Sequence, residues 1–367
     1  MRVGVDAVFL VPGQGGGIER WFRETLCSMD GRGIVVFANR DVLPTLELPE
    51  GAEVVMCPVG ALPRWRRVAW HRFLLPGLVE RARLDVLLCP GNFAPTTRAT
   101  PVVPVVHDLV FRDRPRDFGV AERLGMKSAM ARTIAGARHV IAVSRFTADR
   151  LLEIHGVRES RVTVIRGAPA AVFTPRGPRV EREGGYVLCP VSRKAHKNTW
   201  GALAAWARVL ESNAPCARLV VFGDLSGWEG AFGELLRRPG VAGSVEARGR
   251  VDDAELAALY RGAAAFFNPS MYEGFGLPVL EAMACGAPVV AARGTGMEEA
   301  AAGCGLLVDP RDPADMARGL CRVLADQVFS RDLAARGLAH ARKRSFADTA
   351  REVRAVLAGE AAREPWN

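Results

Sequence analysis

Two glutamates enclose the segment EGFGLPVLE, which runs from Glu273 to Glu281 and carries two glycines and a proline between them. Pro278 is typical of the first turn of a helix, and Gly286 is typical of the position just after one. The preceding AAAFFNPS is a short apolar run that predicts a buried strand. The two acids therefore stand on a strand, loop and helix unit, with the glycines at the entrance of the helix.

The entrance of this helix predicts an anion site. The first N–H groups of a helix have no partner within it, and the helix dipole adds partial positive charge. Here those groups belong to Phe275, Gly276 and Leu277, and the glycines leave room for a phosphate to approach the backbone. Carboxylates accept hydrogen bonds, so sugar hydroxyls are natural partners for Glu273 and Glu281. The alternative is that Glu281 only complements the helix dipole while the glycines make a tight turn.

Two cations follow the first apolar run of the second half of the chain. The segment VSRKAHKN places Arg193 and Lys197 just after YVLCPV, at the carboxyl end of the predicted strand. Positive charge at that position neutralises a diphosphate as charge builds on a leaving group. The alternative is that both residues are solvated surface charges beside a turn.

The first half of the chain offers a glycine loop and a histidine. PGQGGGIER would need a glycine at position 18 to match the dinucleotide fingerprint, and the chain has Ile18 there. The pair Gly16 and Gly17, before a helix, still permits close approach of a phosphate or an acceptor. His107 and Asp108 follow an apolar run, which places them at the carboxyl end of a strand. A single histidine at such a place is often structural.

Several polar residues are better explained as helix caps than as catalysts. GRVDDAEL predicts a loop at Arg250 and Val251, followed by a helix capped by Asp252 or Asp253, and Ser144 in IAVSRFTADR is a second N-cap. The chain has no D-x-D motif and no cluster of histidines or carboxylates at metal-ligand spacing. We therefore expect no metal and no cofactor.

The apolar pattern divides the chain into two α/β halves. Short apolar runs bounded by turn residues alternate with helical segments, which predicts parallel sheets covered on both faces. The pattern restarts at Tyr186, after a stretch of proline, glycine and charge. We predict an N-terminal domain over 1–172, a linker over 173–185, a C-terminal domain over 186–346 and a final helix and tail over 347–367. The sequence does not decide whether that helix completes the second half or crosses back to the first.

Composition excludes several classes of protein. The chain has 367 residues, of which 49% are hydrophobic and 24% charged, as expected for an ordinary globular protein with two domains. No apolar run reaches the length of a membrane span, and the N-terminus resembles no cleavable leader, so we expect a cytoplasmic protein. The eight cysteines are scattered without C-x-x-C spacing, which predicts buried free thiols.

The net charge of +9 suggests an acidic partner, such as an anionic membrane face or a phosphorylated substrate. No nucleic-acid motif accompanies it. In the densest basic stretch, LPRWRRVAWHRFLLPGLVERAR, four arginines interleave with three aromatic residues as in a membrane-surface helix: Arg64, Arg66, Arg67 and Arg72 with Trp65, Trp70 and Phe73. We favour a partly buried helix with a solvated basic face, and keep peripheral contact with the inner membrane face as the alternative.

The string PSMYEGFGLPVLEAMACGAPVV resembles the donor-binding segment of the family 4 retaining glycosyltransferases and matches their E-x7-E pattern with Glu273 and Glu281. GGGIER, VVHDLVFRDRP, IAVSRFT, VTVIRGA, VSRKAHKN and GRVDDAELAALYRGAAAFFNPS resemble further blocks of that family, in the same order. The resemblance covers most of the chain. It implies a GT-B fold, with two Rossmann-like domains whose parallel sheets face an interdomain cleft. The C-terminal RSFADTA lacks the tryptophan often found in the family.

The resemblance also implies roles for particular residues. It places His107 near the reacting carbon, Glu273 at the donor sugar, and Arg193 and Lys197 at the diphosphate, so these four are the expected catalytic residues. It places Glu281 at the ribose hydroxyls. The residues expected to bind the donor are Gly16, Gly17, Arg250, Val251, Phe275, Gly276, Leu277 and Glu281.

The expected function is that of a retaining, metal-independent hexosyltransferase that moves a mannose-type or glucose-type hexose from a nucleotide-diphosphate sugar to a hydroxyl. HDLVFRDRP and LPGLVERARLD resemble mannosyltransferase segments, so GDP-mannose is the first expected donor and a UDP-hexose the second. The acceptor would be a glycan, a lipid-linked sugar or a small metabolite. Two alternatives stay open: a nucleotide-sugar epimerase of the same architecture, and a non-catalytic sugar-nucleotide-binding or glycan-binding protein.

Overall fold

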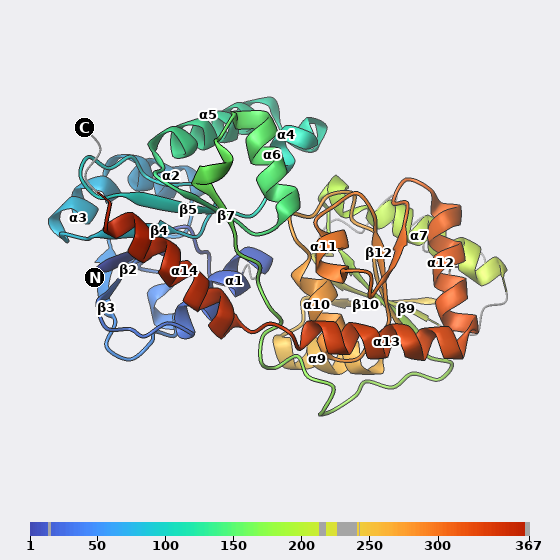
Figure 1. The fold of residues 1–367 in the computed structure, drawn as a ribbon. Coiled ribbons are helices and arrows are strands. Elements are labelled where there is room, and N and C mark those ends of the chain that lie inside the picture. The colour runs from blue at the N-terminus through green and yellow to red at the C-terminus, as the bar shows by residue number, and fades with distance from the viewer. Residues whose placement is uncertain (14–15, 213–217, 226–240, 242, 364–367) are drawn as a thin grey trace. The chain divides into compact units, whose positions relative to one another are not determined.

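The computed structural model describes residues 1–13, 16–212, 218–225, 241 and 243–363 (Figure 1). The chain forms two compact units. The first unit is built from Met1–Gly167 together with Ser345–Asn367, and the second from Ala168–Arg344. Each unit is organised around its own sheet, so each is described separately.

The first unit contains a seven-stranded parallel sheet in the order β3-β2-β1-β4-β5-β6-β7. Its strands are β1 (Val3–Asp6), β2 (Ile34–Asn39), β3 (Glu53–Cys57), β4 (Val86–Cys89), β5 (Val102–Val106), β6 (Val140–Ala142) and β7 (Val162–Val164). Val3 of β1 lies opposite both Ile34 and Val86. β1, β2 and β4 are buried along their whole length because helices cover both faces of the sheet.

The helices of the first unit connect successive strands. They are α1 (Gly17–Cys27), α2 (Arg64–Phe73), α3 (Leu75–Arg81), α4 (Val110–Asp113), α5 (Val120–Gly136) and α6 (Arg145–His155), with short 3₁₀ turns at Leu43–Thr45, Pro115–Asp117 and Glu159–Arg161. Leu75 and Val79 of α3 pack with Leu87 of β4 in one apolar cluster. Met130 of α5 packs with Val106 of β5 in another. The sheet therefore has an apolar core at each of these two places.

The second unit contains a six-stranded parallel sheet in the order β10-β9-β8-β11-β12-β13. Its strands are β8 (Tyr186–Val191), β9 (Arg218–Gly223), β10 (Val245–Gly249), β11 (Ala265–Asn268), β12 (Val289–Ala292) and β13 (Leu306–Val308). Its helices are α7 (Thr199–Glu211), α9 (Asp253–Gly262), α10 (Leu277–Ala284), α11 (Met297–Ala301), α12 (Pro313–Ala325) and α13 (Gln327–Ala341). The expected fold class, two α/β units with parallel sheets, is confirmed.

The C-terminal helix α14 (Phe346–Ala361) belongs to the first unit, which resolves the question that the sequence left open. It begins with a capping box between Ser345 and Asp348 and packs against α1 and β4. The hydroxyl of Thr349 donates to the carbonyl oxygen of Arg166 (2.9 Å). Val353 and Leu357 are fully buried in this packing. In Figure 1, α14 lies along the first sheet.

Smaller expectations have mixed outcomes. Ser144 and Asp252 cap α6 and α9 through side-chain hydrogen bonds, as predicted. Seven cysteines are free thiols in the described residues, and Cys216 lies outside those residues. Four of the seven are buried as predicted, whereas Cys304 and Cys321 are half-buried and Cys27 is exposed. None of the described helices is long and apolar enough to cross a bilayer.

Leu357→Ala tests whether α14 stabilises the first unit. The substitution opens a cavity between α14 and the sheet, and we expect it to lower the free energy of unfolding by about 2 to 5 kcal/mol. Arg351→Ala is the control, because that side chain on the same helix is largely exposed. Urea-induced unfolding measures both variants. Equal stability of Leu357→Ala and the wild type would show that α14 contributes little to the core.

Candidate active site

The candidate site of the second unit lies where its strand order reverses. The chain runs outward from β8 through β9 to β10, then returns to the other side of β8 and runs through β11, β12 and β13. The loops after β8 and β11 therefore diverge at the carboxyl edge of the sheet. Open α/β sheets bind their ligands in the crevice formed at such a switch point. Arg193 and Lys197 follow β8, and Glu273 follows β11, so the sequence-predicted charges flank this point.

The loop after β8 is held in place by Asn198. This residue adopts a left-handed conformation (φ 57°) at the start of α7. Its side-chain amide donates to the carbonyl oxygens of Pro269 (3.0 Å) and Pro310 (2.7 Å), which follow β11 and β13. The backbone N–H of Met271 also donates to the carbonyl oxygen of His196 (2.7 Å). Buried hydrogen bonds thus join three loops of the carboxyl edge into one structure.

Lys197 and Glu273 form an ion pair across the switch point. The Lys197 Nζ atom lies 2.7 Å from Glu273 Oε1, and the two side chains are 31% and 17% exposed. Burial by itself would raise the pKa of Glu273, but the charge of the Lys197 ammonium and hydrogen bonds from Lys197 and Ser270 outweigh it and lower that pKa. Glu273 is therefore ionised at neutral pH and fixed in place by its partner.

Arg193 differs from Lys197 in having no partner of its own. Its side chain is exposed, and within the described residues it makes no ion pair or hydrogen bond. Because Glu273 already neutralises Lys197, Arg193 supplies much of the uncompensated positive charge at this edge.

The EGFGLP loop enters α10 through a tight contact with α11. Gly276 adopts φ 114°, and a Cβ atom there would lie 2.8 Å from Cγ of Met297. A Cβ atom on Gly296 would lie 2.2 Å from the carbonyl oxygen of Gly274. Glycine is thus required on both sides of the contact. Among the described residues, the N–H groups of Phe275, Gly276 and Leu277 meet no acceptor, as expected for the start of a helix.

Glu281 lies in the second turn of α10 and is fully buried (0% exposed). The Tyr260 hydroxyl contacts its Oε2 atom at 3.4 Å. Tyr260 in turn packs edge-to-face on Phe173, Phe222 and Phe266. Binding of a ribose by Glu281 would require this carboxylate to become accessible, so its role at the ribose stays a prediction.

Arg250 and Val251 connect β10 to α9, at the same edge of the sheet but separated from β8 by β9. Arg250 is exposed, and Val251 is half-buried. Their place at the carboxyl end of β10 agrees with a position beside a bound nucleotide, and this role also stays a prediction.

His107 lies at the carboxyl end of β5 in the first unit. Its Nε2 atom lies 2.9 Å from the carbonyl oxygen of Pro90, which only accepts, so Nε2 carries the proton. The ring packs edge-to-face on Trp21 of α1, with the ring centroids 5.5 Å apart. Burial lowers the pKa of His107 to about 4, against a smaller raising effect of the Pro90 hydrogen bond. His107 is therefore a neutral, fixed imidazole near pH 7.

The glycine loop of the first unit ends at Gly16, which precedes α1. Gly16 has extended backbone, and a Cβ atom there would meet nothing within 4 Å. Packing within the described chain therefore does not explain a glycine at this position. Trp21, in the helix that begins at Gly17, packs on His107, so this helix and the histidine are in contact, and the roles of Gly16 and Gly17 stay predictions. The loop residues 14–15 lie outside the described residues.

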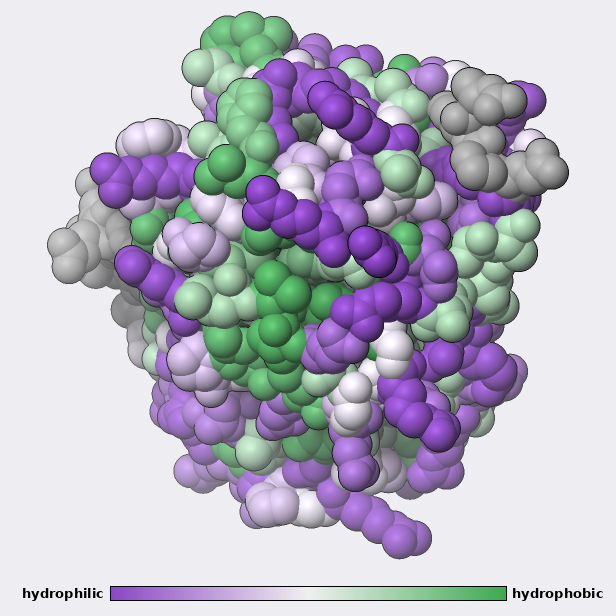
Figure 2. Space-filling view, turned by 90° about the vertical axis from the view of Figure 1, so that its left-hand side faces the viewer, coloured by the Kyte–Doolittle hydropathy of each residue, from purple (hydrophilic) through white to green (hydrophobic). Residues whose placement is uncertain are grey.

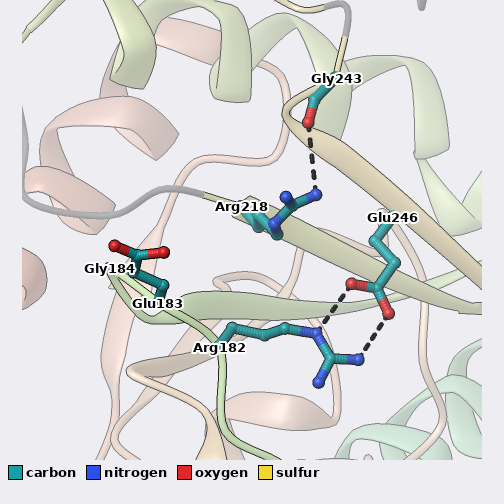
Figure 3. A pocket seen from close by; sticks show the side chains of 6 residues that line it. All are labelled: Arg182, Glu183, Gly184, Arg218, Gly243 and Glu246. Atoms are coloured by element: carbon teal, nitrogen blue, oxygen red, sulfur yellow. Dashed lines mark hydrogen bonds and ion pairs between the residues drawn. The ribbon is translucent and has the colours of Figure 1, made fainter.

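A separate hollow of about 610 Å³ lies at the opposite edge of the second sheet. Figure 3 shows Arg182 paired with Glu246 through two contacts of 2.8 and 2.9 Å, and Arg218 directed at the carbonyl oxygen of Gly243. These residues stand at or before the starts of β8, β9 and β10. Because ligands of parallel sheets bind at the carboxyl ends of strands, this hollow is not the candidate donor site. Within the described residues no three His, Cys, Asp or Glu side chains converge as metal ligands.

Family models match both units. Residues 15–168 match the model described as Glycosyltransferase Family 4, and residues 186–326 match the one described as Glycosyl transferases group 1. The chain is 28% identical to an O-antigen chain mannosyltransferase B from Escherichia coli over 77% of its length and 74% of that protein. It is also 28% identical to a D-inositol 3-phosphate glycosyltransferase from Thermobifida fusca, over 92% and 87% of the two chains.

The fold resembles solved structures over nearly its whole length. The structure of HepE from Anabaena in complex with UDP-glucose superposes with a TM-score of 0.72 at 19% identity, covering 98% of this chain and all of that one. Two parallel-sheet Rossmann-like units of this kind define the GT-B class of glycosyltransferases. The protein is a glycosyltransferase and belongs to family 4 of that class, as the sequence motifs indicated.

Two contributors to the site were missed in the sequence. The sequence motifs assign Asn198 no role of its own, although asparagine is one of the few residues that tolerate a left-handed backbone. Ser270, in the NPS that ends the strand before EGFG, contributes a hydrogen bond to Glu273. The available signal for Ser270 was a short polar residue just after a buried strand, and for Asn198 it was an asparagine directly before a helical segment.

Lys197→Met tests the ion pair. It leaves Glu273 mostly buried without its cation, so we expect a loss of about 1 to 3 kcal/mol in the free energy of unfolding at pH 7. Because the folded pKa of Glu273 is lowered, the pair stabilises the fold above about pH 4, the ordinary glutamate range, and this stabilisation is lost as the pH falls through the folded pKa. Urea unfolding of wild type and variant from pH 7 to pH 3 measures the difference. A difference that does not change with pH would contradict the assignment.

His107→Gln tests the neutral imidazole. Between pH 6.5 and 4 the unfolded chain binds a proton at this histidine that the folded chain excludes, so stability falls as the pH falls through that range. A full shift from about 6.5 to about 4 corresponds to roughly 3 kcal/mol. The variant should lack this part of the pH dependence, measured by urea unfolding at several pH values. The same slope in both proteins would show that His107 titrates normally when folded.

Proposed function

We propose that the protein is a retaining, metal-independent hexosyltransferase that uses a nucleotide-diphosphate sugar. The observation that carries the proposal is the arrangement at the switch point of the second sheet. Exposed Arg193 and paired Lys197 stand on one side of it, and Glu273 stands on the other, just before the N-terminus of α10. Cations with a helix N-terminus suit a diphosphate, and a fixed carboxylate suits a sugar hydroxyl.

The diphosphate in this proposal is held by Arg193, Lys197 and the amides of Phe275 to Leu277. Lys197 then donates to a phosphate oxygen and to Glu273 at once, since an ammonium carries three donors. The position of the sugar relative to the phosphate is thereby set by one side chain. Arg250 and Val251 border the base, and Glu281 reaches the ribose after it becomes accessible.

The proposed reaction exchanges one bond for another at the anomeric carbon. The bond from this carbon to the β-phosphate oxygen breaks, and the acceptor oxygen bonds to the same face, so the configuration is retained. The acceptor proton passes to the departing phosphate oxygen. Arg193, Lys197 and the helix N-terminus stabilise the charge that develops on that oxygen. In the first unit, the family resemblance assigns the reacting carbon to His107, which is neutral and holds its proton at Nε2.

GDP-mannose is the first donor to test and a UDP-hexose the second. The mannosyltransferase-like segments of the sequence and the similarity to an O-antigen mannosyltransferase favour a mannosyl donor. The acceptor class is a hydroxyl of a glycan, a lipid-linked sugar or a small metabolite; one relative is named for an O-antigen chain and another for D-inositol 3-phosphate. The glycine loop at Gly16 and Gly17 would admit the phosphate or the acceptor closely.

Arg193→Ala and Glu273→Gln test the assignment. We expect each to lower kcat/KM for sugar transfer by about 100-fold or more, since each removes a contact to the developing charge or the donor sugar. Arg193→Ala should also reduce the rise in Tm caused by GDP or UDP, because bound ligand stabilises the fold by mass action. Lys194→Ala is the matched control, as an exposed cation next to Arg193.

The outcomes separate the alternatives. Full activity of Arg193→Ala or Glu273→Gln would overturn the assigned roles. Isomerisation of the donor without an acceptor would identify an epimerase, and nucleotide-sugar binding without turnover would identify a binding protein. The nucleotide that raises Tm more, GDP or UDP, names the base.

A further inference from the structure

The outward face of α2 carries apolar side chains that the fold does not use. No residue of α2 is buried, although the helix contains two tryptophans and a phenylalanine. Trp65 and Phe73 are 67% and 68% exposed, and Val68 between them is 54% exposed. At 100° per residue these three fall on the same broad side of the helix as Arg64, Arg66 and Arg72. The expected solvated basic face is therefore basic and apolar at once.

The opposite side of α2 is fixed to the first sheet. Trp70 packs against the apolar cluster around Leu75. The ring of His71 lies 2.7 Å from the buried carboxylate of Asp6, at the end of β1. Arg67 donates to the carbonyl oxygen of Leu10 (3.0 Å). The helix is thus held in one orientation, and its outward face is presented as a rigid surface.

The apolar surface extends beyond the helix. Leu62 and Leu74 flank α2 and are exposed. An ion pair between Arg64 and Glu122 (3.0 Å) joins α2 to α5. We call Leu62, Trp65, Val68, Phe73 and Leu74, with Arg64, Arg66 and Arg72, the α2 patch. Figure 2 shows hydrophobic residues gathered among hydrophilic ones on the side of the first unit where α2 and α3 are drawn.

The arginines of the α2 patch have no acidic residue near them in the sequence. No aspartate or glutamate occurs between Glu53 and Glu80. The Cζ atom of Arg66 lies 5.3 Å from the centre of the Trp65 ring, and that of Arg72 lies 5.0 Å from the centre of the Phe73 ring. Each guanidinium therefore stands beside an aromatic ring, with its charge at the rim of an apolar surface.

We propose that the α2 patch docks on an anionic lipid surface. Aromatic rings and branched apolar side chains suit the boundary between headgroups and acyl chains, and arginines suit lipid phosphates. A second copy of the chain would set arginines against arginines, because a twofold contact pairs a patch with itself. A nucleic acid would leave Leu62, Val68 and Leu74 without apolar partners. The lipid surface satisfies both the charge and the apolar groups.

Vesicle sedimentation of the full chain tests this surface without any sugar donor, so it is independent of the proposed function. We expect binding to vesicles of phosphatidylcholine mixed with phosphatidylglycerol, little binding to phosphatidylcholine alone, and weaker binding at high salt. Arg66→Glu with Arg72→Glu should weaken partitioning by about tenfold or more, since each arginine near an anionic surface contributes. Trp65→Ser with Phe73→Ser should also weaken it.

Matched controls lie on the second unit. Val328→Ser changes an equally exposed apolar residue of α13, and Arg318→Glu reverses an exposed charge of α12. Both should bind vesicles as the wild type does. Absence of binding to anionic vesicles, or equal binding by the patch variants and the wild type, would overturn the proposal. The other possible occupants give a different result. If the patch variants lose self-association or RNA binding but still bind vesicles, the proposal is overturned as well.

Discussion

The constraint on which the site depends is that all strands of a parallel sheet end at the same edge. In the second unit the chain leaves β8 in one direction and returns beside it at β11, so the two loops at this point diverge. Lys197 and Glu273 come from these loops and meet at 2.7 Å. Their ion pair is possible only because residues 76 positions apart in the sequence become neighbours at the switch point.

The two cations at this edge, Lys197 and Arg193, differ in how they are held. Lys197 is held by Glu273, so its position is well defined and its charge is largely compensated. Arg193 is exposed and uncompensated within the described residues, which suits it to attract an anion. Asn198 supports both, because its bonds to Pro269 and Pro310 hold the loop that carries them. An exposed cation and a hydrogen-bonded frame are thus built from one short segment.

The first unit combines a polar edge with two unusual helices. His107 is neutral and fixed between Pro90 and Trp21 at the carboxyl edge. α14 joins this unit from the far end of the chain and buries Val353 and Leu357 in its core, so the unit is complete only when the last helix is present. In contrast to α14, helix α2 buries none of its residues. Contacts with Asp6 and Leu10 hold one side of it, and its other side exposes apolar side chains to solvent.

The sequence by itself determined the alternation of strands and helices, the two parallel sheets and the motif residues at strand ends, because apolar periodicity and turn chemistry are local properties. It predicted Glu273, Arg193 and Lys197 singly, but only the tertiary structure paired Lys197 with Glu273 and buried Glu281 beside Tyr260. Only the structure decided that α14 returns to the first unit and that Trp65 and Phe73 face outward. These contacts join residues that are far apart in the sequence, and a local sequence pattern does not determine which distant surfaces pack together.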